Sequence, residues 1–79
     1  MRHGIDYNQE LELKMTIRLN GEEREVADNA TVEAILEQMR LSPQRVAVEL
    51  NRGLLRTENY NQVLRPGDQL EIVTFVGGG

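Results

Sequence analysis

The chain has 79 residues, no cysteine and a net charge of −4, and 39% of its residues are hydrophobic. This length allows one small domain with a thin core, and the lack of thiols excludes disulfides and thiolate-bound zinc. The nine basic residues are scattered, which argues against a nucleic-acid partner, because phosphate binding needs clustered Lys and Arg. The sequence contains no apolar stretch long enough to cross a bilayer and no apolar signal core in residues 1–8. We therefore expect no membrane association and a cytoplasmic location.

The first part of the chain predicts a polar extension followed by a β-hairpin. Residues 1–14 are expected to be partly disordered or to lengthen the first strand. Strand periodicity is carried by alternate apolar positions: Leu11, Leu13, Met15, Ile17 and Leu19. Asn20-Gly21 favours the positive backbone angles of a tight turn, and residues 22–27 are predicted to form the returning strand.

A helix is predicted over residues 32–40, with Thr31 as its N-cap. Its apolar face has spacings of three and four, at Val32, Ile35, Leu36 and Met39. Glu33 in the first turn and Arg40 in the last would suit the helix dipole. Pro43 prevents extension far beyond residue 41.

The second half of the chain predicts three more strands. Residues 46–50 are rich in β-branched side chains and are predicted to form the third strand. Residues 54–56 are predicted to form a short strand after a turn, and residues 69–76 are predicted to form the final strand. Residues 57–62 could cap one helical turn, and Pro66-Gly67 sets the turn before the last strand. This order predicts an α+β, β-grasp fold over residues 15–76. In it, a mixed sheet of about five strands wraps around one helix, and the last strand can pair beside the first.

Conventional catalytic sites are absent from the sequence. The single histidine, His3, lies in the extension, so a nucleophilic triad would have no base in the predicted domain. Glu33 and Glu37 lie one helical turn apart, and a solvated face explains them better than a metal site. We interpret three glutamates as exposed charges of the hairpin: Glu22, Glu23 and Glu25. These side chains could also contact basic residues on a partner. We predict no catalytic residue, no metal ligand and no bound cofactor.

The remaining candidate for chemistry is the glycine tail, Gly77 to Gly79. Glycine has no Cβ, so Gly77 and Gly78 could enter a narrow channel in a partner's active site. The carboxylate of Gly79 could then be activated as an acyl-adenylate and converted by a sulfur nucleophile to a thiocarboxylate. The simpler alternative is an unstructured end, since termini fray.

The final strand also predicts a docking surface beside the tail. Alternation places Leu70, Ile72 and Thr74 on one face and Glu71, Val73 and Phe75 on the other. If the first set packs on the helix, Val73 and Phe75 point outward and form a partner-docking surface together with Val76. Alternatively, Phe75 packs against the end of the sheet or the N-terminal extension.

Residues 15–79 resemble the ThiS family, the ubiquitin-like sulfur carriers of thiamine biosynthesis. The resemblance rests on Met15 to Gly21, Thr31-Val32, Val46 to Asn51, Gly67-Asp68, Leu70 to Val73 and Phe75 to Gly79. It implies a monomeric carrier that is not an enzyme. A ThiF-like adenylating enzyme would use ATP to activate Gly79, a cysteine desulfurase or other persulfide donor would supply sulfur, and thiazole synthase would receive it. The extension before Met15 has no counterpart in this resemblance.

Two other functions remain open from the sequence. The small subunit of molybdopterin synthase shares the fold and tail chemistry, but commonly carries prolines before the glycines, where this chain has Thr74-Phe75-Val76. A ubiquitin-like interaction module with an inert tail is the alternative from another class.

Overall fold

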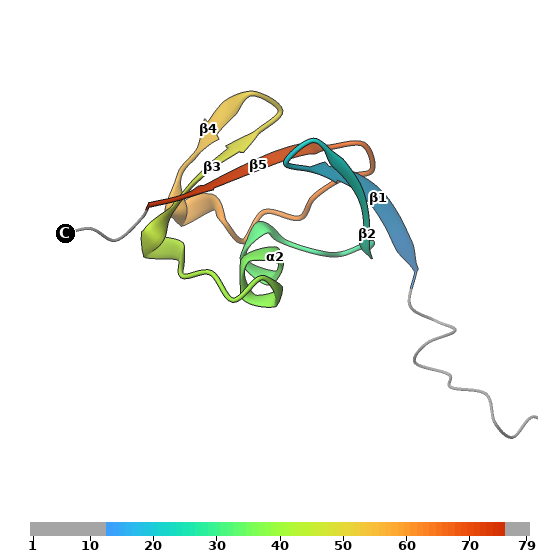
Figure 1. Cartoon of the computed structure of the whole chain (residues 1–79). Helices are drawn as coiled ribbons and strands as arrows, with labels where there is room; N and C mark the ends of the chain where they lie inside the picture. Colours follow the sequence, from blue (N-terminus) through green and yellow to red (C-terminus); the bar gives the residue numbers. More distant parts are fainter. Residues whose placement is uncertain (1–12, 76–79) are drawn as a thin grey trace, which may run out of the picture.

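The computed structural model describes residues 13–75; residues 1–12 and 76–79 lie outside the described part. The elements in chain order are β1 (Lys14–Leu19), β2 (Glu22–Ala27), α2 (Val32–Gln38), η1 (Pro43–Arg45), β3 (Val46–Leu50), β4 (Gly53–Leu55), η2 (Thr57–Asn59) and β5 (Gln69–Thr74). The strands form one sheet in the order β2-β1-β5-β3-β4, and α2 lies against one face of it (Figure 1). β5 runs parallel to β1 and antiparallel to β3. These features confirm the β-grasp fold with a mixed sheet of five strands.

The core lies between the sheet and α2. In β1, burial alternates as predicted, with Met15, Ile17 and Leu19 buried. The largest fully buried side chains come from all parts of the domain: Ile17, Leu36, Leu64, Leu70, Val32 and Val48. Each such side chain contributes roughly 1.5–3 kcal/mol by leaving water. Burial of apolar surface therefore stabilises a chain that contains no cysteine.

The two turns that were predicted to contain residues with positive φ are confirmed. Asn20 and Gly21 adopt φ values of +51° and +84°, so this pair closes the β1–β2 hairpin with two left-handed residues. Gly67 has φ of +84°, and the Asp68 N–H donates to the Arg65 carbonyl at 3.0 Å. Proline followed by a left-handed glycine is the pattern of a type II turn.

The helix begins as predicted and ends earlier. The Thr31 hydroxyl accepts from the Ala34 N–H at 3.1 Å, which confirms the N-cap. The predicted end at residue 40 is wrong, because α2 ends at Gln38 and Arg40 adopts a φ of +60°. The Leu41 N–H donates to the Leu36 carbonyl at 2.9 Å and the Arg40 N–H to the Glu37 carbonyl at 3.0 Å. This Schellman arrangement closes the helix before Pro43 is reached.

Smaller differences concern the ends of elements. β4 begins and ends one residue earlier than predicted, and the helical turn after it covers only Thr57–Asn59. β5 ends at Thr74 rather than at residue 76, which lies outside the described residues. Thr74 is exposed although alternation places it on the core side. Leu13 is 63% exposed and precedes β1, while Leu11 lies outside the described part.

Candidate functional site

The described chain ends at a fixed point of the fold. The Phe75 N–H donates to the Arg45 carbonyl at 2.8 Å, which extends the pairing of β5 one residue past its last strand position. The start of β1 and the end of β5 lie at opposite ends of the molecule (Figure 1). Residues Val76, Gly77, Gly78 and Gly79 lie outside the described part. These four residues therefore follow a strand whose end is held by a backbone hydrogen bond to η1.

Side-chain hydrogen bonds also fix the first half of β5. The Asn51 carboxamide oxygen accepts from the Gln69 N–H at 2.9 Å, and its amide nitrogen donates to the Asp68 carboxylate at 3.0 Å. The Asn20 side-chain oxygen accepts from the Ile72 N–H at 2.7 Å, beyond the point where β1 and β5 stop pairing. Two turn residues therefore hold β5 in register, a role that sequence reasoning did not assign to them. The signal available was only that Asn stands at turn positions, where its side chain can bond nearby backbone.

The outward face of the sheet near the end of β5 is apolar. Val73 and Phe75 are 59% and 58% exposed, which agrees with the outward orientation of both side chains. Packing of Phe75 against the N-terminal extension concerns residues that lie outside the described part. On the inward face, Leu70 and Ile72 are buried. Val73 pairs with Ala47 of β3, and Leu54 of β4 is 71% exposed. Leu54 lies opposite Glu49, with β3 between it and β5. Sequence reasoning missed Ala47 and Leu54, because only strand pairing shows that they share the outward face with Val73.

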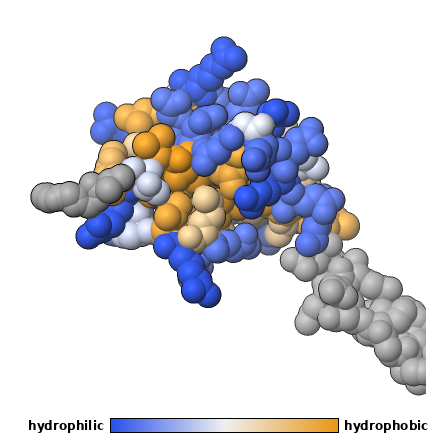
Figure 2. Space-filling view, viewed as in Figure 1, coloured by the Kyte–Doolittle hydropathy of each residue, from blue (hydrophilic) through white to orange (hydrophobic). Residues whose placement is uncertain are grey.

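The other half of the same face is charged. Arg18 of β1 lies opposite Glu23 of β2, with 3.9 Å between guanidinium nitrogen and carboxylate oxygen. Both side chains are largely exposed, so this pair contributes little to stability. Glu22 and Glu25 are exposed on the same hairpin. In Figure 2, hydrophilic surface covers the β1–β2 side, and apolar surface gathers toward the middle and the end of β5.

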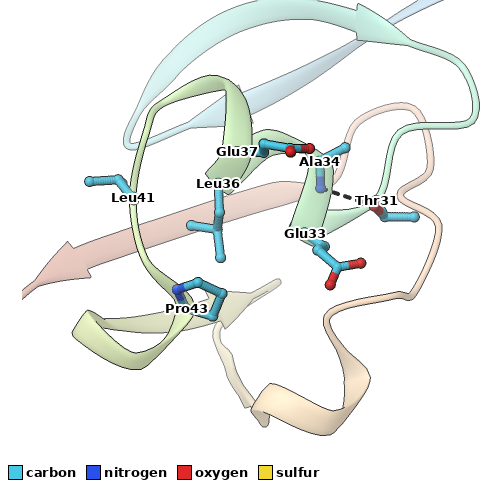
Figure 3. A pocket seen from close by; sticks show the side chains of 7 residues that line it. All are labelled: Thr31, Glu33, Ala34, Leu36, Glu37, Leu41 and Pro43. Atoms are coloured by element: carbon cyan, nitrogen blue, oxygen red, sulfur yellow. Dashed lines mark hydrogen bonds between the residues drawn. The ribbon is translucent and has the colours of Figure 1, made fainter.

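A pocket lies on the helix side of the domain (Figure 3). Leu36, Leu41 and Pro43 supply its apolar wall, and Glu33 and Glu37 stand at its rim. The nearby Thr31 hydroxyl is engaged by the Ala34 N–H. Within residues 13–75, no group of three metal-ligating side chains comes together. The described residues also contain no helix long and apolar enough to span a membrane.

Comparison with known proteins places this geometry in a family. The model of the ThiS family matches residues 17–79. The sulfur carrier protein ThiS of Bacillus subtilis is 37% identical over 65 residues, which are 80% of this chain and 98% of that protein. The crystal structure of a thiamine biosynthesis protein (ThiS) from Geobacter metallireducens matches with a TM-score of 0.68 at 30% identity, over 82% of this chain and 100% of that one.

A thiazole synthase from Paramagnetospirillum magneticum is 44% identical over 66 residues, which are 82% of this chain but 20% of that protein. The chain thus spans about a fifth of the length of this relative, and the same holds for the thiazole synthase of Magnetococcus marinus. The β-grasp fold, the match of the family model through Gly79 and the relatives of similar length agree. The chain belongs to the ThiS family.

Proposed function

We propose that this chain is a sulfur carrier for thiazole formation in thiamine biosynthesis, with the carboxylate of Gly79 as its working group. The observation that supports this proposal is the end of β5. The Phe75 N–H ties the end of β5 to η1, and Val73 and Phe75 are exposed there. Val76 and the sequence Gly77-Gly78-Gly79 follow. The name of the Bacillus subtilis relative, a sulfur carrier protein, supports the same role.

The proposed chemistry takes place in three steps on partner proteins. A carboxylate oxygen of Gly79 attacks the α-phosphorus of ATP in a ThiF-like adenylating enzyme, and pyrophosphate leaves. The terminal sulfur of a persulfide, carried by a cysteine desulfurase or another donor, then attacks the acyl carbon and AMP leaves. This forms an acyl disulfide. A thiol cleaves its S–S bond, becomes part of a new disulfide and releases the thiocarboxylate.

Thiazole synthase is the proposed acceptor of the sulfur. Two relatives named thiazole synthase contain a segment similar to this chain, and that segment makes up 20% of each polypeptide. A thiazole synthase that carries a ThiS-like segment on the same chain supports a functional interaction between a ThiS-family protein and thiazole synthase. In the proposal, the thiocarboxylate of Gly79 enters the acceptor's active site and transfers its sulfur to the forming ring.

In this role the chain itself is a substrate rather than an enzyme. ATP is consumed by the activating partner, and the free carrier is a monomer of the cytoplasm. The lack of side chains at Gly77 and Gly78 would allow the tail to enter two different active sites.

The test is the intact mass of the chain after incubation with ATP, the adenylating enzyme, a cysteine desulfurase, cysteine and a thiol reductant. Replacement of one oxygen by sulfur at Gly79 is expected, and omission of ATP should prevent it. A variant that lacks Gly79 should remain folded and show no mass change. An unmodified wild-type terminus with partners that modify the Bacillus subtilis ThiS protein would contradict the proposal. Sulfur delivery to molybdopterin synthase instead of thiazole synthase would redirect it to the other pathway.

A further inference from the structure

Two glutamates face each other on the outward face of the sheet. In the antiparallel pairing of β3 and β5, Glu49 lies directly opposite Glu71, and in the pairing of β3 and β4 the same Glu49 lies opposite Leu54. Both glutamates are exposed. The next outward row along the strands is Val73 opposite Ala47. A carboxylate pair thus borders the apolar surface near the end of β5.

This register carries a cost in the free protein. Like charges directly opposite each other in an antiparallel pair are destabilising. Among residues 13–75, the structure contains one ion pair, between Arg18 and Glu23 on the other half of the face. Arg56 follows β4 directly, and it forms no ion pair with Glu49 in the described part of the chain. The two carboxylates are therefore not neutralised by a described basic residue of the domain.

The tail limits where a partner that modifies it must sit. Four residues, from Val76 to Gly79, follow the fixed Phe75, and fully extended they span at most about 14 Å. An active site that holds the Gly79 carboxylate must therefore lie close to the end of β5. The surrounding partner surface will cover the nearest exposed side chains, and Val73 and Glu71 come two and four residues before Phe75.

We propose that Glu49 and Glu71, together with Val73, Ala47 and Leu54, form one composite docking surface for the adenylating enzyme. The surface fits a partner with an apolar patch bordered by Lys or Arg side chains that reach both carboxylates. Binding would replace repulsion between the two glutamates by attraction to the partner's cation, while the apolar rows lose contact with water. This inference rests on the proposed function, because it needs an enzyme that modifies Gly79.

The proposal predicts opposite effects of one substitution on stability and on affinity. Glu71→Gln and Glu49→Gln should each raise the Tm of the free chain by about 1–5 °C, because repulsion across the strands is removed. Each should also weaken binding to the adenylating enzyme about threefold to tenfold. Leu54→Ala should weaken binding with little change in Tm, since this side chain is 71% exposed.

The matched control is Glu37→Gln, which makes the same charge change at an exposed position of α2, on the opposite side of the sheet. Thermal melts and titration calorimetry with the purified adenylating enzyme at low and high salt provide the measurements. The double variant Glu49→Gln with Glu71→Gln should show a weaker salt dependence of affinity than wild type, and the control should behave as wild type.

Each result bears on the proposal. Wild-type affinity and salt dependence in the double variant, while the tail is still adenylated, would overturn the docking surface and leave the sulfur-carrier function intact. An equal loss of affinity in Glu37→Gln would also overturn it, because the effect would then reflect net charge alone. Failure of the wild-type chain to bind or to be adenylated would overturn both proposals.

Discussion

At the scale of single residues, Arg40 adopts a backbone conformation that suits glycine. Its φ of +60° places it at the left-handed position that closes α2. An L-residue with a Cβ pays about 1–2 kcal/mol for this region, and glycine does not. No sequence pattern predicts this left-handed conformation of Arg40, because Arg near a helix end also fits the helix dipole.

Arg40→Gly is therefore expected to raise the free energy of unfolding by about 0.5–1 kcal/mol, net of the greater entropy of glycine in the unfolded chain. Chemical denaturation measures it. Arg56→Gly is the control, because Arg56 has an ordinary φ of −80° and should lose stability on the same change. A loss of stability in Arg40→Gly would mean that the arginine side chain makes a contribution larger than the backbone strain.

Asn20 has two functions in one residue. Its φ of +51° shapes the β1–β2 turn, and its side-chain oxygen accepts from the Ile72 N–H at 2.7 Å. Asn20→Ala should lower the free energy of unfolding by about 2–3 kcal/mol, because it strains the turn and leaves a part-buried donor without its acceptor.

Asn20→Gly separates the two contributions, because glycine keeps the turn and lacks the acceptor. We expect a loss of about 1–2 kcal/mol for glycine, smaller than for alanine. Equal losses in urea denaturation would show that the backbone conformation of residue 20 adds nothing to the cost.

At the scale of elements, β5 combines a buried face with an exposed face on one strand. Ile72 is 7% exposed and faces the core, whereas Val73 and Phe75 face outward. Hydrogen bonds to Asn51, Asn20 and Arg45 hold the strand at successive points. This arrangement allows the outward side chains to change without loss of the fold.

Phe75→Ala should therefore weaken binding to the adenylating enzyme about tenfold or more and change the free energy of unfolding by less than about 1 kcal/mol. Ile72→Ala on the same strand should do the reverse and cost about 2–5 kcal/mol of stability. Calorimetric titration and denaturation distinguish the two. A large loss of stability with unchanged binding in Phe75→Ala would place its ring in the core.

At the scale of the whole molecule, a glycine sequence follows the domain that the structure describes over residues 13–75. The proposed function requires that Gly78 enters a channel too narrow for a side chain. Gly78→Val should then reduce adenylation at least about a hundredfold, and the melting temperature should not change, because the described core lies within residues 13–75.

Pyrophosphate release measures adenylation directly. A matched surface change within the domain, Glu58→Val in η2, should leave it unaffected. Normal pyrophosphate release by Gly78→Val would remove the reason for glycine at that position.

The sequence by itself determined the order of strands and helix and the face of β1 that is buried. It also determined the positions of the turns, because periodicity, Asn20-Gly21 and Pro66-Gly67 are local signals that act within a few residues. It also pointed to the glycine tail and to Val73 and Phe75 as outward side chains, and left open whether Phe75 packs on the body.

Only the tertiary structure decided how distant strands pair. The register of β3 with β4 and β5 places Ala47 opposite Val73, Leu54 opposite Glu49, and Glu49 opposite Glu71. The exposure of Phe75 likewise became known only from the folded structure. Register is set by the burial of the whole inward face against α2, and no local pattern in one strand specifies its partner. The early end of α2 was likewise not predictable from local propensity. The Leu41 N–H donates to the Leu36 carbonyl across Arg40, which has a φ of +60°, and both leucines pack in or against the core.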